Sequence, residues 1–274
     1  MSTTLTLTGG TVLLIWLAEQ MTLRGVGNGL ALLLCVGIVA EFASTAASTA
    51  GLNRVGLLSG DAMIALAGLT IILVALIAFM ERARRLVPLE FTRSSEASGT
   101  RRDRSHLALK LNGADIMPAI IAGWFVYVPI AIAGIIPHVE QGWFATALRH
   151  MQPGRPAHMI FTAVVVAILA LVYTAFVIDP EHAADSLQAR GGAIPEIAPG
   201  EATADHLDRV VTFTTLIGAA YLVAVLLIPE ALIAYAKVPY YFAGGSVLII
   251  VCAVLDIEAQ VRARSLTGRG GNSS

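Results

Sequence analysis

The sequence predicts an all-α integral membrane protein, a polytopic helix bundle with five to six full membrane spans and a truncated first helix. The chain of 274 residues is 56% hydrophobic and 14% charged, whereas about 25% of an ordinary soluble domain is charged. Its mean hydropathy is +0.75, and its apolar residues gather in runs of the length that crosses ~30 Å of hydrocarbon. This composition argues against a soluble globular enzyme. The net charge of −1 argues against direct nucleic-acid binding.

Each predicted span is a run of mostly apolar residues. The clearest runs are residues 62–80, 157–178, 210–228 and 240–255. Residues 114–136 form a fifth span, whose two prolines a packed membrane helix can accommodate, and residues 26–43 form a sixth. Residues 1–17 are apolar but rich in threonine, and they lack the basic start and cleavage site of a signal peptide. We expect them to be the back half of a membrane helix whose front half is absent.

Basic residues orient the predicted spans, because cytoplasmic loops of membrane proteins carry the excess of Lys and Arg. If Arg24 is cytoplasmic, most of the 18 basic residues fall in cytoplasmic segments. The other side of the membrane then holds Arg54, Arg149, Arg155 and Lys237. The opposite orientation inverts this ratio, so we expect the loops 81–111 and 179–209 to be cytoplasmic.

These two loops are too long to be simple connectors, since loops beyond about 15 residues are usually functional or disordered. Loop 81–111 carries net positive charge and loop 179–209 net negative charge. The basic loop fits either attraction to anionic lipid headgroups or docking of a cytoplasmic partner, and charge alone favours neither. Residues 261–274 end in a Ser- and Gly-rich stretch that we expect to be a disordered tail.

Two local features have simpler explanations. In the GVGNG turn at residues 25–29, glycine permits a tight turn and Asn28 can cap the helix that follows. Asp115 lies only three residues after Asn112, at the start of a span. A carboxylate inside a membrane is costly, so we expect Asp115 to be solvated at the membrane interface.

Several stretches together carry a family resemblance. They are TGGTVLLIWLAEQMTLRGVGNG near the start, MERARRLVPLEF, SHLALKLN with the following Pro118-Ala119-Ile120, YTAFVIDPEHAADSL with PEIAPGEATADHLDRV, and VPYYFAGGSVLIIV. In this order and spacing they resemble SecY, the central subunit of the Sec protein-translocation channel. Residues 1–43 resemble the end of its fourth helix and its fifth helix. Residues 62–260 resemble its second half, which has five membrane helices.

The resemblance implies a fold and a function. SecY-like chains have two halves related by an inverted repeat, with the channel between them. The first three helices of the family have no counterpart here. The implied function is to conduct unfolded polypeptides across or into the membrane, without bond chemistry and without a cofactor or metal. The implied location is the bacterial inner membrane. The implied partners are SecE- and SecG-like subunits, the SecA motor, the ribosome, anionic lipids and a separate N-terminal SecY half.

The resemblance also assigns residues to two sites. Bulky aliphatic side chains form a constriction that grips the passing polypeptide and excludes hydrated ions; the matching positions here are Leu30, Leu34, Ile120 and Ile249. Partner docking falls on the two loops, at Arg82, Arg84, Arg85, Arg101, Arg102, Arg104, Ala198, Pro199 and Gly200.

The acidic loop departs most from the family pattern. Ala198 stands where the family has the arginine that docks SecA and the ribosome, and Glu196 stands where it has a glycine. Each charge-assisted hydrogen bond lost with such a cation is worth about 1.5–3 kcal/mol. We therefore expect weaker docking than in the family.

Three alternatives remain open at this stage. One is a diverged, non-functional remnant of such a channel. Another is a small-solute transporter. The third is an intramembrane enzyme, whose candidate residues near one membrane face are Asp179, His182, Asp185, His206 and Asp208. No nucleophile motif accompanies these residues, and the six histidines are scattered without a metal-ligand spacing.

Overall fold

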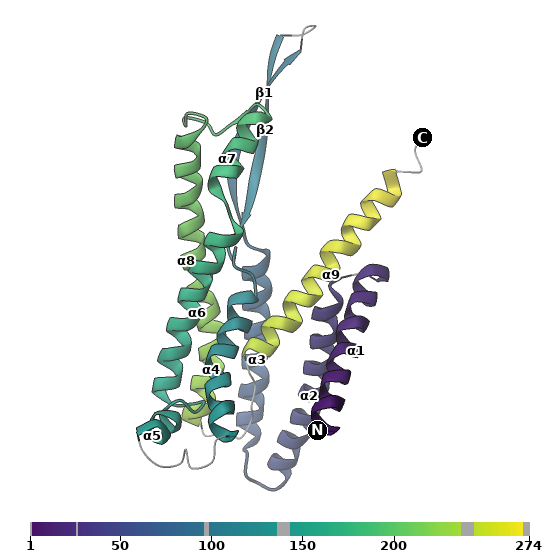
Figure 1. The fold of residues 1–274 in the computed structure, drawn as a ribbon, viewed down its shortest axis with the longest axis vertical. Coiled ribbons are helices and arrows are strands. Elements are labelled where there is room, and N and C mark those ends of the chain that lie inside the picture. The colour runs from purple at the N-terminus through teal and green to yellow at the C-terminus, as the bar shows by residue number, and fades with distance from the viewer. Residues whose placement is uncertain (1, 26, 96–98, 136–142, 237–243, 271–274) are drawn as a thin grey trace. The chain divides into compact units, whose positions relative to one another are not determined.

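The structure is a computed structural model that describes residues 2–25, 27–95, 99–135, 143–236 and 244–270. The described chain is mostly helical, as the predicted all-α class requires. Its elements in chain order are α1 (Ser2–Arg24), α2 (Gly29–Arg54), α3 (Gly60–Arg82), β1 (Arg84–Ser95), β2 (Gly99–Lys110), α4 (Met117–Ile135), α5 (Trp143–His150), α6 (Pro156–Val177), α7 (Pro180–Ala189), β3 (Gly192–Ala193), α8 (Glu201–Ala236) and α9 (Gly244–Gly270). Figure 1 traces them along the chain.

The chain divides into two compact units. Unit 1 comprises Met1–Ala78 and Leu232–Ser274, and therefore holds α1, α2, most of α3 and α9. Unit 2 comprises Phe79–Ala231, and therefore holds the end of α3, the three strands, α4 to α7 and most of α8. Within unit 1, α2 packs against both α1 and α9; within unit 2, α4 packs against α6.

The number of membrane helices agrees with the predicted five to six spans. Among the described residues, five helices are long and apolar enough to cross a membrane: Gly29–Arg54, Gly60–Arg82, Pro156–Ala189, Glu201–Leu232 and Gly244–Ser265. Within α4, Met117–Ile132 forms a shorter apolar helix. The chain is an integral membrane protein.

Three helices extend beyond their apolar runs. α2 continues to Arg54, and the hydroxyls of Thr45 and Thr49 donate to carbonyl oxygens one turn back, each at 2.8 Å. These bonds satisfy polar side chains that would otherwise disfavour a membrane helix. α8 begins at Glu201, well before residue 210. α9 continues to Gly270 through a segment expected to be disordered; residues 240–243 and 271–274 lie outside the described residues.

A small antiparallel sheet is the main feature that the sequence analysis missed. β1 and β2 form a hairpin in which Arg84 lies opposite Lys110 and Ser95 opposite Gly99. β3 pairs with β1 only at Glu90 and Phe91, so the strand order is β2-β1-β3. Pro88 is tolerated in β1 because β3 does not reach it.

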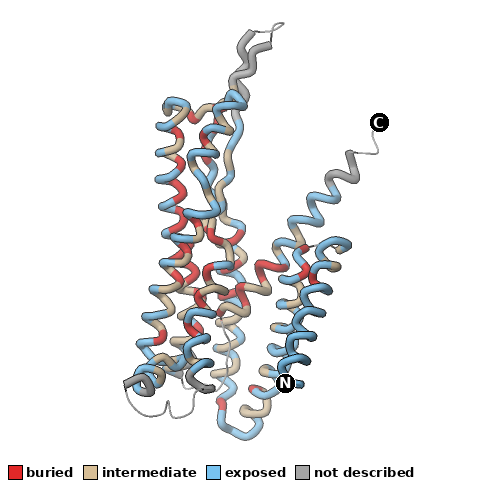
Figure 2. Tube along the Cα trace, viewed as in Figure 1, coloured by how far each residue is buried: buried red, intermediate tan, exposed pale blue. Residues whose placement is uncertain are grey.

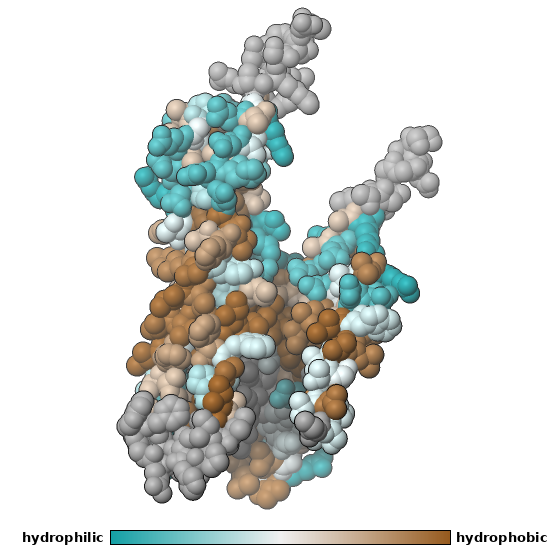
Figure 3. All heavy atoms as spheres, in the orientation of Figure 1, coloured by the Kyte–Doolittle hydropathy of each residue, from teal (hydrophilic) through white to brown (hydrophobic). Residues whose placement is uncertain are grey.

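The distribution of exposed side chains in unit 2 is that of a membrane protein. Leu222 and Val225 of α8 are fully buried, and Figure 2 shows buried positions recurring along this helix. Large apolar side chains on α6 face outward, among them Phe176, which is 87% exposed. In the face seen in Figure 3, hydrophobic side chains cover α4 and α6, and hydrophilic ones gather at the α7 end of the unit. Such a broad apolar surface requires lipid or protein to cover it.

Candidate functional site

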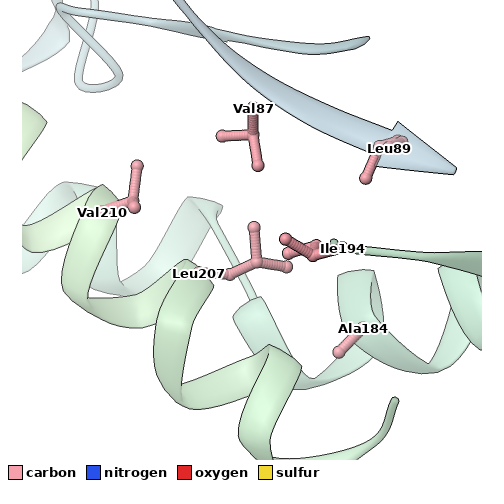
Figure 4. Packing of buried hydrophobic residues seen from close by; sticks show 6 residues of the cluster. All are labelled: Val87, Leu89, Ala184, Ile194, Leu207 and Val210. Carbon is pink, nitrogen blue, oxygen red and sulfur yellow. The ribbon is translucent and has the colours of Figure 1, made fainter. Parts of the chain in front are cut away.

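The two long polar loops fold together into one structure, which we call the hairpin cap. It comprises β1, β2, α7, β3 and the first turns of α8 through residue 210. Its core is formed by six buried residues, namely Val87, Leu89, Ala184, Ile194, Leu207 and Val210. They come from β1, α7, the residue after β3, and α8, as Figure 4 shows. Burying a Val or Leu side chain contributes about 1.5–3 kcal/mol. The cap is therefore held by its own apolar core.

Local features fix α7 and β3 within the cap. Asp179 is the N-cap of α7, and its carboxylate accepts a hydrogen bond from the backbone N–H of His182 at 3.0 Å. At Gly192, an added Cβ would lie 2.7 Å from Leu187 Cδ1 and 2.8 Å from Phe91 Cε1. Glycine at this position lets β3 approach β1 closely. Two of the enzyme candidates, Asp179 and His182, thus take part in helix capping.

The segment before α8 presents an exposed tip at residues 198–200. The side chains of Ala198 and Pro199 are exposed, and the Ala198 carbonyl accepts a hydrogen bond from the Thr203 hydroxyl at 2.9 Å. Gly200 has φ +98° and Glu196 has φ +68°. Glu196 is thus a side-chain-bearing residue in the left-handed region, which costs about 1–2 kcal/mol. It is the position where the family pattern has glycine.

The surface of the cap between residues 179 and 209 is acidic. All seven of its carboxylate residues are exposed, and two exposed arginines are the only basic residues on this segment, in a stretch that the structure describes throughout. The acidic residues are Asp179, Glu181, Asp185, Glu196, Glu201, Asp205 and Asp208. This surface favours a cationic partner over an anionic one.

A buried polar network lies at the base of the cap, where α3 leads into β1 and β2 leads into α4. Oε1 of Glu81 accepts hydrogen bonds from Asn112 Nδ2 at 2.8 Å and from the Tyr221 hydroxyl at 3.4 Å. Asn112 Nδ2 also donates to the Asp115 carbonyl at 3.1 Å. Glu81, Asn112 and Tyr221 are 8%, 1% and 6% exposed. α3, α8 and the segment between β2 and α4 therefore meet at one carboxylate.

Asp115 and Gly218 border this network. The Asp115 side chain is 46% exposed and lies 3.9 Å from Lys110 Nζ; that it is solvated at the membrane interface stays a prediction. Its φ of +57° is a conformation that Asp tolerates better than most residues. At Gly218 of α8, an added Cβ would lie 3.2 Å from Asn112 Cα, Asn112 Oδ1 and the Leu111 carbonyl oxygen. The backbone of α8 therefore packs closely against the segment between β2 and α4.

A second buried polar contact joins α6 and α8 at the α5 end of unit 2. Nδ1 of His158 lies 2.7 Å from Oε1 of Glu230, and the same oxygen accepts the backbone N–H of Gly154 at 2.6 Å. The His158 ring also stacks at a tilt on Tyr127 of α4, with ring centroids 6.2 Å apart. Nothing in the sequence analysis predicted this contact.

In unit 1, the turn between α1 and α2 is held by side chains of α9. Asn28 Oδ1 accepts the backbone N–H of Leu30 at 3.0 Å, which confirms the predicted N-cap. Gly27, with φ +92°, donates its N–H to Gln260 Oε1 at 2.7 Å. Arg264 donates to the Gly25 carbonyl at 2.9 Å.

Comparison with known proteins identifies the family. The SecY family model matches residues 1–258. The chain belongs to the SecY family. It is 36% identical over 255 residues to the protein translocase subunit SecY of Escherichia coli strain K12, a match that covers 92% of this chain and 58% of the relative. It is 34% identical over 264 residues to the corresponding subunit of Vibrio cholerae, over 94% of this chain and 60% of the relative. The chain thus spans less than two thirds of these SecY relatives.

Solved structures share the fold. One, described as the structure of a protein conducting channel, has a TM-score of 0.63 at 17% identity and covers 97% of this chain and 65% of that one. Another, which concerns the plug domain of the SecY protein, has a TM-score of 0.61 at 18% identity, with coverage of 97% and 66%. At such identities the likeness shows the SecY fold alone.

The four predicted constriction residues lie on three helices. Leu30 and Leu34 occupy the first two turns of α2 and are 55% and 44% exposed. Ile249 is half-buried on α9, in the same unit. Ile120 is half-buried on α4, in unit 2. That the four form one ring, as the SecY resemblance implies, stays a prediction.

The predicted docking residues lie in two places: at the end of α3 and on the β1–β2 hairpin, and in the segment between β3 and α8. Arg84 and Arg85 are exposed at the start of β1, and Arg82 is exposed at the end of α3. On β2, Arg101, Arg102 and Arg104 lie opposite Arg93, Thr92 and Glu90 of β1. Residues 198–200 lie in the segment between β3 and α8. The sequence analysis did not predict that one apolar core joins the hairpin to α7 and α8. A signal for the strands was present, because apolar residues alternate at 87, 89 and 91 and at 107 and 109, the period-2 pattern of strands.

Proposed function

We propose that these 274 residues form one side of a protein-conducting channel for Sec-dependent translocation of unfolded polypeptides across or into the bacterial inner membrane. The observation that carries the proposal is the SecY match over residues 1–258. Because the relatives are longer, the other wall of the channel comes from a further SecY-like segment, such as a separate N-terminal half. Leu30, Leu34, Ile120 and Ile249 then contribute to the constriction.

The hairpin cap is the proposed docking site for a cytoplasmic partner, either SecA or the ribosome. Its support is structural: a sheet and a helix with their own core project from the membrane helices, and basic residues lie along both strands of the hairpin. SecE- and SecG-like subunits and anionic lipids are the proposed neighbours of the broad apolar faces. The acidic surface of residues 179–209 favours a partner with a cationic contact surface.

Photo-crosslinking to an arrested secretory precursor tests the channel-lining role. A photoreactive amino acid is placed at Leu34 or Ile249 in cells that also express the front segment of E. coli SecY. The matched control is Phe176, whose side chain is 87% exposed on α6. We expect crosslinks from Leu34 and Ile249 and none from Phe176. Equal crosslinking from all three sites, or none from the first two, contradicts the proposal.

A further inference from the structure

The hairpin is attached to α8 at two separate places. The first is the apolar core, where Val87 and Leu89 of β1 pack with Leu207 and Val210 of α8. The second is the polar network at the base of the cap, where Tyr221 of α8 reaches Glu81. Fourteen residues separate Leu207 from Tyr221, which is about 21 Å along a helix that rises 1.5 Å per residue.

The two attachments have different mechanical consequences. A hairpin held only by the apolar core can rotate about that contact. A second contact about 16–21 Å away along the same helix, measured from Val210 and from Leu207, blocks this rotation. At this second contact Glu81 and Asn112 are buried and joined by a hydrogen bond of 2.8 Å, and α8 meets them through the Tyr221 hydroxyl and the backbone at Gly218. A side chain at Gly218 would displace Asn112, so this approach of α8 has little freedom.

The network also closes the base of the hairpin. Glu81 is the residue before the last of α3, and Asn112 follows β2 after one intervening residue. Their side-chain bond and the backbone bond from Leu111 N to the Ala83 carbonyl at 3.0 Å tie the two strands where they enter and leave the membrane helices. Any movement of the hairpin must therefore carry with it the end of α3 and the segment that leads into α4.

We propose that Glu81, Asn112 and Tyr221 are positioning residues that make the hairpin and α8 move as one rigid body. A partner that displaces the hairpin then displaces α8 within the membrane. This inference rests on the proposed function in one respect, namely that a docked partner supplies the displacement. The rigid connection itself is a property of this chain alone.

Distance measurements between spin labels test the connection directly. Labels are attached at Ser105→Cys on β2 and Leu216→Cys on α8, with Cys35 and Cys252 replaced by alanine, in lipid nanodiscs. Glu81→Leu removes the acceptor of both hydrogen bonds and should broaden the distance distribution. Glu81→Gln keeps an oxygen acceptor for both donors and should restore the narrow distribution. Identical distributions in all three proteins overturn the proposal.

A second variant guards against misfolding of Glu81→Leu. Gly218→Ala changes no polar group but pushes against Asn112, and it should also broaden the distribution. The matched control is Gly68→Ala in α3, where an added Cβ has nothing within 4 Å. Broadening in Gly68→Ala equal to that in Gly218→Ala, or none in Gly218→Ala, overturns the proposal.

A functional measurement distinguishes transfer of the hairpin's movement to α8 from docking of the partner. With SecA and the front segment of E. coli SecY present, Glu81→Leu should lower the translocation rate while its affinity for SecA stays that of the parent. A parallel loss of affinity means that the network only builds the docking surface, which overturns the proposal. If the parent protein itself binds no SecA and translocates nothing, the proposed function fails, while the spin-label distances still decide whether the connection is rigid.

Discussion

The side-chain amide of Asn112 donates to the carboxylate of Glu81 across 2.8 Å, and thereby joins the end of α3, which leads into the hairpin, to the segment that follows it. Both side chains are buried, and the hydroxyl of Tyr221 on α8 approaches the same oxygen. An unpaired buried carboxylate would be costly. The three side chains therefore depend on one another for the hydrogen bonds of this buried carboxylate.

The first prediction concerns the apolar core of the hairpin cap. Leu207→Ala should destabilise the cap by about 2–5 kcal/mol, the usual cost of removing a buried leucine side chain. Hydrogen–deuterium exchange should therefore speed up at the amides of β1. Leu86→Ala is the matched control, because Leu86 is 61% exposed and its loss should change stability by less than about 0.5 kcal/mol. Comparable acceleration in the two variants contradicts the assigned core.

The second prediction concerns the left-handed backbone conformation of Glu196. Because its φ of +68° is unfavourable for a residue with a Cβ, Glu196→Gly should stabilise the segment before α8 by up to about 1 kcal/mol. Limited proteolysis of residues 195–200 should slow accordingly. Gly200→Ala, at φ +98°, should have the opposite effect. Faster cleavage of Glu196→Gly would count against the left-handed conformation.

The exposed tip makes the third prediction. Ala198→Arg should restore a charge-assisted hydrogen bond worth about 1.5–3 kcal/mol, and should raise the affinity for SecA by at least about tenfold. Ala202→Arg adds the same charge at an exposed site in the first turn of α8 and is the control. An equal gain in both variants would show a general charge effect rather than a contact at the tip.

The contact between α6 and α8 makes the fourth prediction. Glu230→Ala removes the acceptor of the Gly154 amide and the partner of buried His158. It should lower the free energy of unfolding in detergent by about 1–3 kcal/mol. Asp208→Ala, at an exposed site, should be nearly neutral. A double-mutant cycle with His158→Leu should show coupling; additivity would mean that the two side chains act independently.

The membrane helices could be predicted from the sequence because their signal is strong. The ends of the run at residues 157–178 lie within one residue of those of α6, and Asn28 takes its expected N-cap role. The far end of α2 could not be predicted, because the serines and threonines after residue 43 look polar in the sequence yet bond to their own helix. A hydropathy scale does not include such hydrogen bonds between a side-chain hydroxyl and a backbone carbonyl oxygen of its own helix.

The hairpin cap and the polar network were harder to predict. The strands carry alternating apolar residues, but the hairpin is highly charged, which is also typical of a solvated loop. The network joins residues that are 31 and 140 positions apart, and no local pattern indicates such a meeting. The His158–Glu230 pair was missed for the same reason, since 72 positions separate its members.

The central claim is that these residues form one side of a channel whose other side must be supplied. It is tested most directly by measuring uptake of a secretory precursor into vesicles that contain this chain, SecE- and SecG-like subunits and SecA. We expect uptake when the front segment of E. coli SecY is included, and none when it is omitted. Equal uptake with and without that segment would contradict the account.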